Sequence, residues 1–186
     1  ADILFGKYNP SAKLPITFPR NLGQVPIYYN QKNTGRPISK ENPTEDYKSN
    51  YIDSPNTPLY PFGHGLSYTT FKYSEIKLSS DKIKESEILK ASSTITNSGD
   101  YDGHEVVQLY IRDKVGSITR PIKELKGFKK IFLKKGESKT VVFEILSEDL
   151  KFYNNGKLIL ESGEFEIAIS PSSDFEFNKL FNLILN

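Results

Sequence analysis

The sequence predicts a mainly β protein: an immunoglobulin-like sandwich preceded by the remnant of an α/β domain and a long packed linker. Three observations predict this fold class. From Phe71 onward, apolar and polar residues alternate in short runs, as in half-buried strands. Turn residues interrupt these runs about every ten residues, which is typical of a sandwich. Before Phe71, the chain is rich in Pro, Asn and Tyr and shows little periodicity.

Composition narrows the class of protein further. The 186 residues are 37% hydrophobic and 26% charged, which argues against a disordered protein or a membrane protein. No apolar run is long enough to span a bilayer. A net charge of +2 without a basic block argues against nucleic-acid binding. Cysteine is absent, which excludes disulfides, thiolate metal sites and cysteine nucleophiles.

Residues 1–29 are predicted to be the C-terminal end of an α/β domain. Ala1–Gly6 has the pattern of a last helical turn that stops at a glycine. Leu14–Phe18 suits an edge strand at best, because Pro15 and Pro19 cannot donate backbone hydrogen bonds. A helix that ends this early has almost nothing before it, so we expect the chain to be the C-terminal piece of a longer protein.

Residues 30–68 are predicted to form a packed linker. The first part is polar and irregular, and a loop of this length is uncommon inside a compact domain and often functional. Residues 56–71 combine prolines and glycines with large apolar side chains, which indicates a rigid connector. The tyrosines of this region either form a platform for sugars or pack onto a neighbouring domain. They are Tyr28, Tyr29, Tyr47, Tyr51, Tyr60 and Tyr68.

Residues 69–186 are predicted to form the sandwich, with about seven short strands. Phe71 and Tyr73 alternate, and the pattern resumes with shifted parity at Ile76, which predicts a bulge near residues 74–75. A longer strand is expected over residues 122–133, interrupted at a glycine. The other predicted inward faces are Leu89-Ala91-Ser93-Ile95, Val107-Leu109-Ile111, Val141-Phe143-Ile145, Leu158-Leu160 and Phe165-Ile167-Ile169, with a last strand within residues 175–185.

Two further features refine the sandwich prediction. Ser147 is expected to be the N-cap of a single helical turn, because acidic residues follow it. Cys and Trp are both absent, so the Cys–Trp–Cys mark of true immunoglobulin domains is excluded. A fibronectin type III-like sandwich is therefore the better choice.

The residues alone predict no catalytic or metal site. His64 and His104 have neither a serine in a nucleophile-elbow context nor carboxylates that the spacing brings near. Glu164 and Glu166 share a strand face about 6.6 Å apart at a rise of about 3.3 Å per residue, a separation found in inverting glycosidases. Any Glu-x-Glu strand has this spacing, and the opposite face is apolar, so we interpret the pair as a solvated face.

Several ordered motifs cover nearly the whole chain. They are Asp2–Arg20, Tyr28–Pro37, Pro58–Phe71, Thr96–Asp113 and Arg120–Phe128. Through them the chain resembles the C-terminal part of glycoside hydrolase family 3 enzymes, the β-glucosidase group. Two positions depart from the family pattern. Ala12 stands where Gly is expected, and His64 stands where Tyr is common.

The resemblance implies a parent enzyme with a barrel domain, an α/β sandwich domain and a fibronectin type III-like domain. It also implies a retaining mechanism whose Asp nucleophile and Glu acid/base lie upstream of Ala1, so no catalytic residue, metal or cofactor is expected in this segment. The implied partners are the upstream barrel and α/β domains and a β-glucoside or oligosaccharide substrate, and a homodimer is left open. The parent is expected to be periplasmic or secreted.

The resemblance also directs attention to the linker. Asn33, Arg36 and the adjacent Tyr28 and Tyr29 are expected to contact the α/β domain or to approach the leaving-group side of the substrate cleft. Arg36 offers a planar fork for carboxylates or sugar hydroxyls. The alternative is a purely structural clamp.

The resulting expectation is a non-catalytic C-terminal segment of a retaining β-glucosidase-type hydrolase that stabilises or shapes the catalytic domains. One alternative is a carbohydrate-binding or protein-interaction module, with Tyr101 or Tyr110 as its aromatic platform. A second alternative is a standalone adhesive or structural immunoglobulin-like protein.

Overall fold

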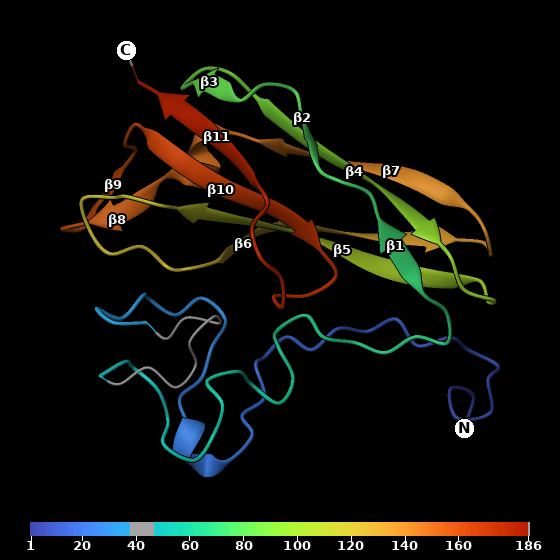
Figure 1. The fold of residues 1–186 in the computed structure, drawn as a ribbon. Helices are drawn as coiled ribbons and strands as arrows, with labels where there is room; N and C mark the ends of the chain where they lie inside the picture. Colours follow the sequence, from blue (N-terminus) through green and yellow to red (C-terminus); the bar gives the residue numbers. More distant parts are fainter. Residues whose placement is uncertain (38–46, 186) are drawn as a thin grey trace.

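The computed structural model of the protein describes residues 1–37 and 47–185. From Phe71 onward, two β-sheets pack face to face (Figure 1). The described residues before Phe71, drawn in blue to teal, run irregularly along one side of this sandwich, and the two ends of the chain lie at opposite ends of the picture. The predicted mainly β sandwich is confirmed. Within the described residues, no helix is long and apolar enough to cross a membrane.

The smaller sheet has β4 at its centre, with antiparallel neighbours on both sides. Its strands are β1 (Phe71–Tyr73), β2 (Lys77–Leu78), β4 (Leu89–Asn97) and β7 (Ser138–Ile145). Both β1 and β2 pair with the same edge of β4, so together they form one interrupted edge strand.

The interruption between β1 and β2 is the predicted bulge. Tyr73 pairs with Ile95, whereas Lys77 pairs with Ser92, so one extra residue lies on the edge strand. The bulge near residues 74–75 is therefore confirmed. Because of the extra residue, the apolar side chains on both sides of the bulge point towards the core.

The larger sheet has the strand order β3-β11-β10-β5-β6, in which β3 and β11 are parallel and the other pairs antiparallel. Its strands are β3 (Lys82–Lys84), β5 (Gly103–Asp113), β6 (Glu124–Leu133), β10 (Gly163–Ser170) and β11 (Lys179–Ile184). The predicted interruption of β6 is confirmed, because Leu109 pairs with Gly127 but the next residue, Tyr110, pairs with Leu125. Lys126 is thus the extra residue of a second bulge.

Short elements complete the described part of the chain. They are the 3-10 helix η1 (Leu22–Gln24), the helical turn α1 (Ser147–Leu150) and a hairpin of β8 (Phe152–Asn154) and β9 (Lys157–Ile159). The described residues contain eleven strands rather than about seven. The broken edge strand, the short β3 and this hairpin account for the excess.

The predicted cap of α1 is wrong by one residue. Ser147 is the first helical residue, and Leu146 occupies the N-cap position. The backbone N–H of Leu146 donates to the carboxylate of Asp149 at 2.9 Å. A carboxylate at the third helical position therefore closes the turn, and the cap needs no side-chain hydroxyl.

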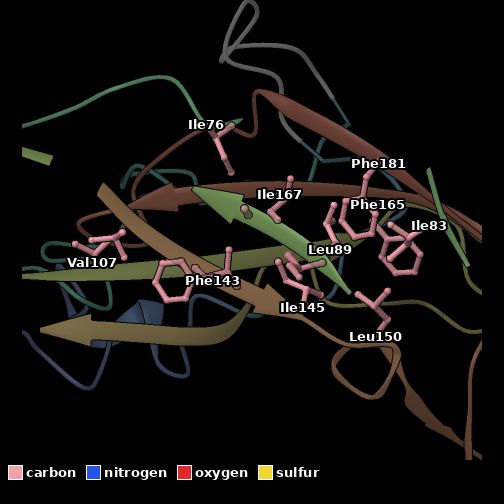
Figure 2. Close-up of a cluster of buried hydrophobic side chains, with 14 of the residues drawn as sticks. Ile76, Ile83, Leu89, Val107, Phe143, Ile145, Leu150, Phe165, Ile167 and Phe181 are labelled. Carbon is pink, nitrogen blue, oxygen red and sulfur yellow. The ribbon is translucent and has the colours of Figure 1, made fainter. Parts of the chain in front are cut away.

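The core lies between the two sheets (Figure 2). The predicted inward faces are buried, with two exceptions: Ile169 is only half-buried, and the Leu158-Leu160 face is wrong, because Leu158 is exposed and Leu160 only half-buried. The buried members are Leu89, Ala91, Ser93, Ile95, Val107, Leu109, Ile111, Val141, Phe143, Ile145, Phe165 and Ile167. Across one end of the core, the rings of Phe165 and Phe181 stack with centroids 5.3 Å apart.

The first residues form one helical turn, in which Phe5 N–H donates to the carbonyl of Ala1 at 3.0 Å and Gly6 follows with a φ of +73°. The edge strand predicted over Leu14–Phe18 is wrong as a regular strand. Its two ends pair with residues 59–64, but prolines in both segments interrupt the ladder.

We expect Leu89→Ala to lower the free energy of unfolding by about 2–5 kcal/mol, because it opens a cavity in the core. Leu89 is 0% exposed, whereas its neighbour Ile88 is 48% exposed. Ile88→Ala is the matched control and should cost less than about 1 kcal/mol. Urea unfolding followed by circular dichroism measures both, and equal losses would contradict the inward face assigned to β4.

Candidate functional site

Residues 1–37 and 47–70, here called the linker strip, cover part of the outer face of β5 and β6. Among the described residues, none of the buried hydrophobic residues of the core precedes Ile76. Large apolar side chains of the strip point to solvent instead. Leu4, Phe5, Leu22, Ile52 and Leu66 are each at least 74% exposed. The strip therefore has little core of its own and depends on what it packs against.

Tyr29 fastens the linker strip to the sandwich. Its ring stacks on Phe62 with centroids 4.3 Å apart and meets the ring of Tyr110 edge-on at 6.0 Å. Its hydroxyl accepts a hydrogen bond from the backbone N–H of Leu125 at 3.4 Å. Burial raises the pKa of the Tyr29 phenol, and the hydrogen bond from Leu125 opposes that shift. These contacts favour the clamp alternative for Tyr29.

Gln108 joins three parts of the chain beneath this tyrosine. Its amide donates to the carbonyls of Pro171 at 2.6 Å and Gly63 at 3.4 Å, and its oxygen accepts from the Tyr110 hydroxyl at 2.6 Å. Gly63 has a φ of +78°, and a Cβ there would lie 2.3 Å from the Gln108 side-chain oxygen. Only glycine fits this close approach.

Tyr110 cannot serve as an aromatic platform for carbohydrate. It is 0% exposed, because the linker strip and the ring of Phe175 at 5.0 Å cover it. Burial raises the pKa of its phenol well above the ordinary range. The prediction for Tyr110 is wrong, since alternation along β5 assigns it to the outer face but does not show what lies on that face. Tyr101, the other predicted platform residue, is 62% exposed.

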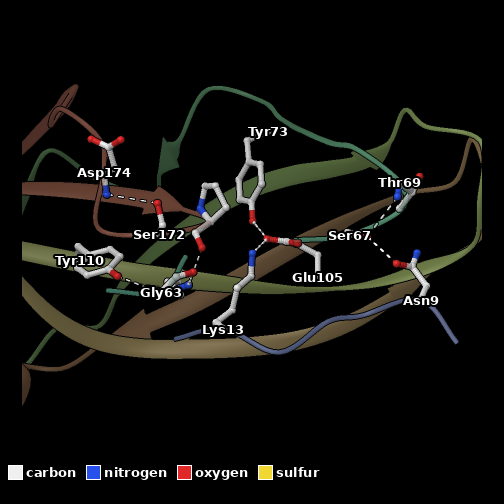
Figure 3. A network of polar contacts seen from close by, with 12 residues as sticks. Asn9, Lys13, Gly63, Ser67, Thr69, Tyr73, Glu105, Tyr110, Ser172 and Asp174 are labelled. Carbon is white, nitrogen blue, oxygen red and sulfur yellow. Dashed lines mark hydrogen bonds and ion pairs between the residues drawn. The ribbon is translucent and has the colours of Figure 1, made fainter. Parts of the chain in front are cut away.

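The linker strip makes a second polar contact with the sandwich, through Lys13, Glu105 and Tyr73 (Figure 3). The Lys13 ammonium lies 3.1 Å from a carboxylate oxygen of Glu105, and the Tyr73 hydroxyl donates to the same oxygen at 2.9 Å. The side chains of Lys13 and Glu105 are only 15% and 5% exposed. Burial, and then the negative charge of Glu105, raises the pKa of Tyr73 far above its ordinary value. Tyr73 therefore stays a neutral donor to the carboxylate.

Sequence reasoning missed Lys13 and Glu105. A signal was present, because Glu105 shares the parity of Val107 and Leu109 on a strand whose inward face is apolar. A carboxylate at such a position must have a partner, since burying an unpaired charge is costly. The sequence does not show which cation supplies it.

The remaining predicted site residues, Asn33, Tyr28 and Arg36, are all exposed. Asn33 lines a hollow of about 560 Å³ between the two arms of the strip, together with Gln31, Ser49, Asn50 and Tyr51, among others. Its walls combine amides and hydroxyls with apolar side chains, among them Ile27 and Ile122. The structure therefore places Asn33 at a hollow of mixed polar and apolar character.

Tyr28 and Arg36 are exposed and are not among the residues that line this hollow. The carbonyl of Arg36 accepts a hydrogen bond from Ser49 N–H at 2.8 Å, which holds the two arms together. Tyr28 is 51% exposed, whereas Tyr29 points inward. Of the four predicted residues, Tyr29 therefore packs against the sandwich, whereas Tyr28, Asn33 and Arg36 are exposed.

Other groups with catalytic potential are engaged in packing or in ion pairs. His64 stacks on Tyr60 and His104 lies against a phenylalanine, each with centroids 5.0 Å apart. Glu166 pairs with Arg112 at 3.0 Å, and Glu164 pairs with a lysine. Within residues 1–37 and 47–185, no group of three or more metal-binding side chains could hold a metal ion.

These features define a class of protein: a fibronectin type III-like β-sandwich preceded by an irregular strip that packs along it. Family comparisons agree with both parts. The model of the glycosyl hydrolase family 3 C-terminal domain matches residues 1–68, and that of the fibronectin type III-like domain matches residues 105–173. The chain belongs to glycoside hydrolase family 3 and carries its C-terminal region.

Individual relatives support this membership. The chain is 52% identical to a periplasmic beta-glucosidase of Salmonella typhimurium over 93% of its own length and 23% of that protein. It is 46% identical to a putative beta-xylosidase of Formosa agariphila over 93% of its length and 22% of that protein. A beta-glucosidase of Listeria innocua solved with glucose superposes with a TM-score of 0.90 at 44% identity, over 98% of this chain and 25% of that one. The chain thus spans about a quarter of these relatives.

We expect the free energy of unfolding to fall as the pH rises above about 10, by up to about 1.4 kcal/mol per pH unit for each buried tyrosine. Tyr73 and Tyr110 have folded-state pKa values raised above the unfolded value. They ionise first in the unfolded chain, so their contribution is complete below that value and is lost above it. Urea unfolding at about pH 9 and about pH 11 measures the loss.

Tyr73→Phe should make this loss shallower, because it removes one of the two raised phenols. Tyr101→Phe is the matched control, since Tyr101 is 62% exposed and the change removes the same hydroxyl from the surface. Equal slopes in the two variants would show that Tyr73 is not held neutral by its surroundings.

Proposed function

We propose that the chain is the non-catalytic C-terminal segment of a retaining β-glucosidase-type hydrolase, and that it stabilises or shapes the catalytic domains. The exposed apolar side chains of the linker strip carry this proposal. Soluble monomers rarely leave large apolar patches in water, and such patches mark interaction sites. A strip seated firmly on the sandwich on one side and apolar on the other is suited to join the sandwich to further domains.

The partners of this surface are upstream barrel and α/β domains of the same enzyme. Residues 1–29 complete the α/β domain, residues 30–68 link it to the sandwich, and residues 69–186 form the sandwich. The match of the family's C-terminal domain model to residues 1–68 supports a boundary near residue 68. In the full-length enzyme, Leu4 and Phe5 of the first turn are buried by the α/β domain.

The enzyme hydrolyses O-glycosyl bonds of a β-glucoside or oligosaccharide. The names of the relatives support a β-glycosidase, and they include both beta-glucosidases and beta-xylosidases. The choice of sugar therefore depends on residues outside this segment. The enzyme works in the periplasm or outside the cell, as the name of the Salmonella typhimurium relative indicates for that protein.

Within the linker strip, Asn33, Arg36 and Tyr28 contact the α/β domain. All three are exposed, and Asn33 lines a hollow with both polar and apolar walls. The guanidinium of Arg36 is suited to bidentate contact with a carboxylate of the neighbouring domain. A place on the leaving-group side of the substrate cleft is the alternative for the same residues.

We expect Leu22→Asp to destabilise the full-length enzyme by about 1–3 kcal/mol, because a charge would enter an apolar interface. In the 186-residue chain the same change should be nearly neutral, since Leu22 is 87% exposed. Thermal unfolding of both proteins measures the difference. Tyr153→Asp is the control, because Tyr153 is 70% exposed on the β8–β9 hairpin and should be neutral in both. Neutrality of Leu22→Asp in the full-length enzyme would refute the docking surface.

We expect Arg36→Ala in the full-length enzyme to lower the melting temperature while kcat and KM for an aryl β-glucoside stay unchanged. A contact between domains contributes to stability but does not touch the substrate. Lys32→Ala, on the same exposed arm, is the control for loss of a surface cation. A raised KM with an unchanged melting temperature would instead place Arg36 on the leaving-group side of the cleft.

A further inference from the structure

The outer face of β6 leaves two phenylalanines in contact with solvent. Phe128 and Phe132 are 66% and 46% exposed, and Lys130, also exposed, lies between them on the same face of the strand. These three residues are called the β6 face below. Phe128 pairs with Gln108 of β5, and opposite residues of an antiparallel pair point to the same side of a sheet. The β6 face therefore lies on the side of the larger sheet along which the linker strip packs.

The β6 face continues into the exposed apolar surface of the linker strip. The ring of Phe132 lies against the ring of His104, with centroids 5.0 Å apart. His104 in turn lines a hollow of about 140 Å³ together with Leu66 of the strip, which is 74% exposed. His104 thus connects the two sets of exposed apolar side chains. Contiguous apolar patches of this kind mark interaction sites.

We propose that the β6 face is buried against the upstream α/β domain in the full-length enzyme. This inference rests on the proposed function, which places most of that domain outside this chain. The chain spans 23% of the Salmonella typhimurium relative, so most of an enzyme of that size is available to cover the face. The hollow beside Phe132 supports the choice of domain. Lys13, from the segment that we assign to the α/β domain, lines it together with His104.

A second copy of the chain fits this face less well. β6 is an edge strand, and the free edge of a strand can add a strand from another molecule. Part of this edge is already used, because the backbone N–H of Leu125 donates to the Tyr29 hydroxyl at 3.4 Å. The Lys129 ammonium also reaches from β6 to β7, where it donates to the carbonyl of Val142 at 2.5 Å. A two-fold contact through the β6 face would bring two Lys130 ammoniums together, and like charges that meet in an interface repel.

The three side chains also define the chemistry of the partner surface. Phe128 and Phe132 need apolar side chains opposite them, because only apolar contacts gain free energy from the burial of their rings. Within residues 1–37 and 47–185, no ion pair involves Lys130. Burying an unpaired ammonium is costly, so the partner must supply a carboxylate. We therefore expect an Asp or Glu of the α/β domain between two apolar positions.

Carbodiimide cross-linking of the full-length enzyme, followed by peptide mass spectrometry, tests the contact at Lys130. We expect an amide bond between Lys130 and an Asp or Glu of the α/β domain upstream of Ala1. Lys72 is the control, because it is exposed on β1 of the smaller sheet and should form no such link. Mixing 15N-labelled and unlabelled enzyme before the reaction shows whether a link joins two copies.

Phe128→Asp tests the apolar part of the contact. In the full-length enzyme it should lower the melting temperature by about 2 °C or more, because it places a carboxylate in an apolar interface. In the 186-residue chain it should have little effect, since Phe128 is 66% exposed there. Tyr153→Asp is the matched control, because Tyr153 is 70% exposed on the β8–β9 hairpin and the change should be neutral in both proteins.

Two results would overturn the inference. One is an equal melting temperature of Phe128→Asp and Tyr153→Asp in the full-length enzyme, and the other is the absence of any link from Lys130 to a peptide upstream of Ala1. The variants also separate this inference from the proposed function. If Leu22→Asp destabilises the full-length enzyme and Phe128→Asp does not, the strip docks without the β6 face. If both variants are neutral, the proposed function fails as well.

Discussion

The position of the linker strip depends on one buried ion pair. Glu105 lies on the inward-facing parity of β5 and is 4% exposed, so its carboxylate must be compensated within the protein. Lys13 supplies that charge from the strip, and Tyr73 adds a hydrogen bond from β1. Removing one partner of a buried pair costs about 3–5 kcal/mol, because an uncompensated charge is left behind. The sandwich and the strip are therefore joined by a constraint that neither part satisfies alone.

The outer face of the larger sheet also depends on the linker strip, which covers part of it. In an antiparallel sheet, one face usually meets water. Here Gln108 and Tyr110 of that face are buried, because Gly63 approaches closely enough to share a hydrogen bond with Gln108, and Tyr29 closes over Tyr110. The strip thus acts as an adaptor. Its inner side is matched to the sandwich, and its outer side is left apolar for the domains we propose it joins.

Sequence periodicity predicted the sandwich well, but it predicted the contacts between the linker strip and the sandwich poorly. The inward faces of β4, β5, β7 and β10 and both strand irregularities follow from local alternation and parity, which a single strand carries by itself. The cap of α1 was misplaced, because a nearby carboxylate replaced the expected hydroxyl. Tyr110 was misjudged as exposed, because alternation identifies two faces of a sheet but not what covers each one.

The sequence by itself determined the β architecture, the family resemblance and the rigid character of the Pro- and Gly-rich connector. Each of these depends on residues close together in the sequence, either as a local pattern or as an ordered motif. Only the tertiary structure decided that Tyr29 points inward, that Asn33 lines a hollow, and that Tyr68 and Tyr101 line another hollow together. These placements join residues distant in sequence. Their energies depend on desolvation and on which partners meet, and no local pattern specifies either one.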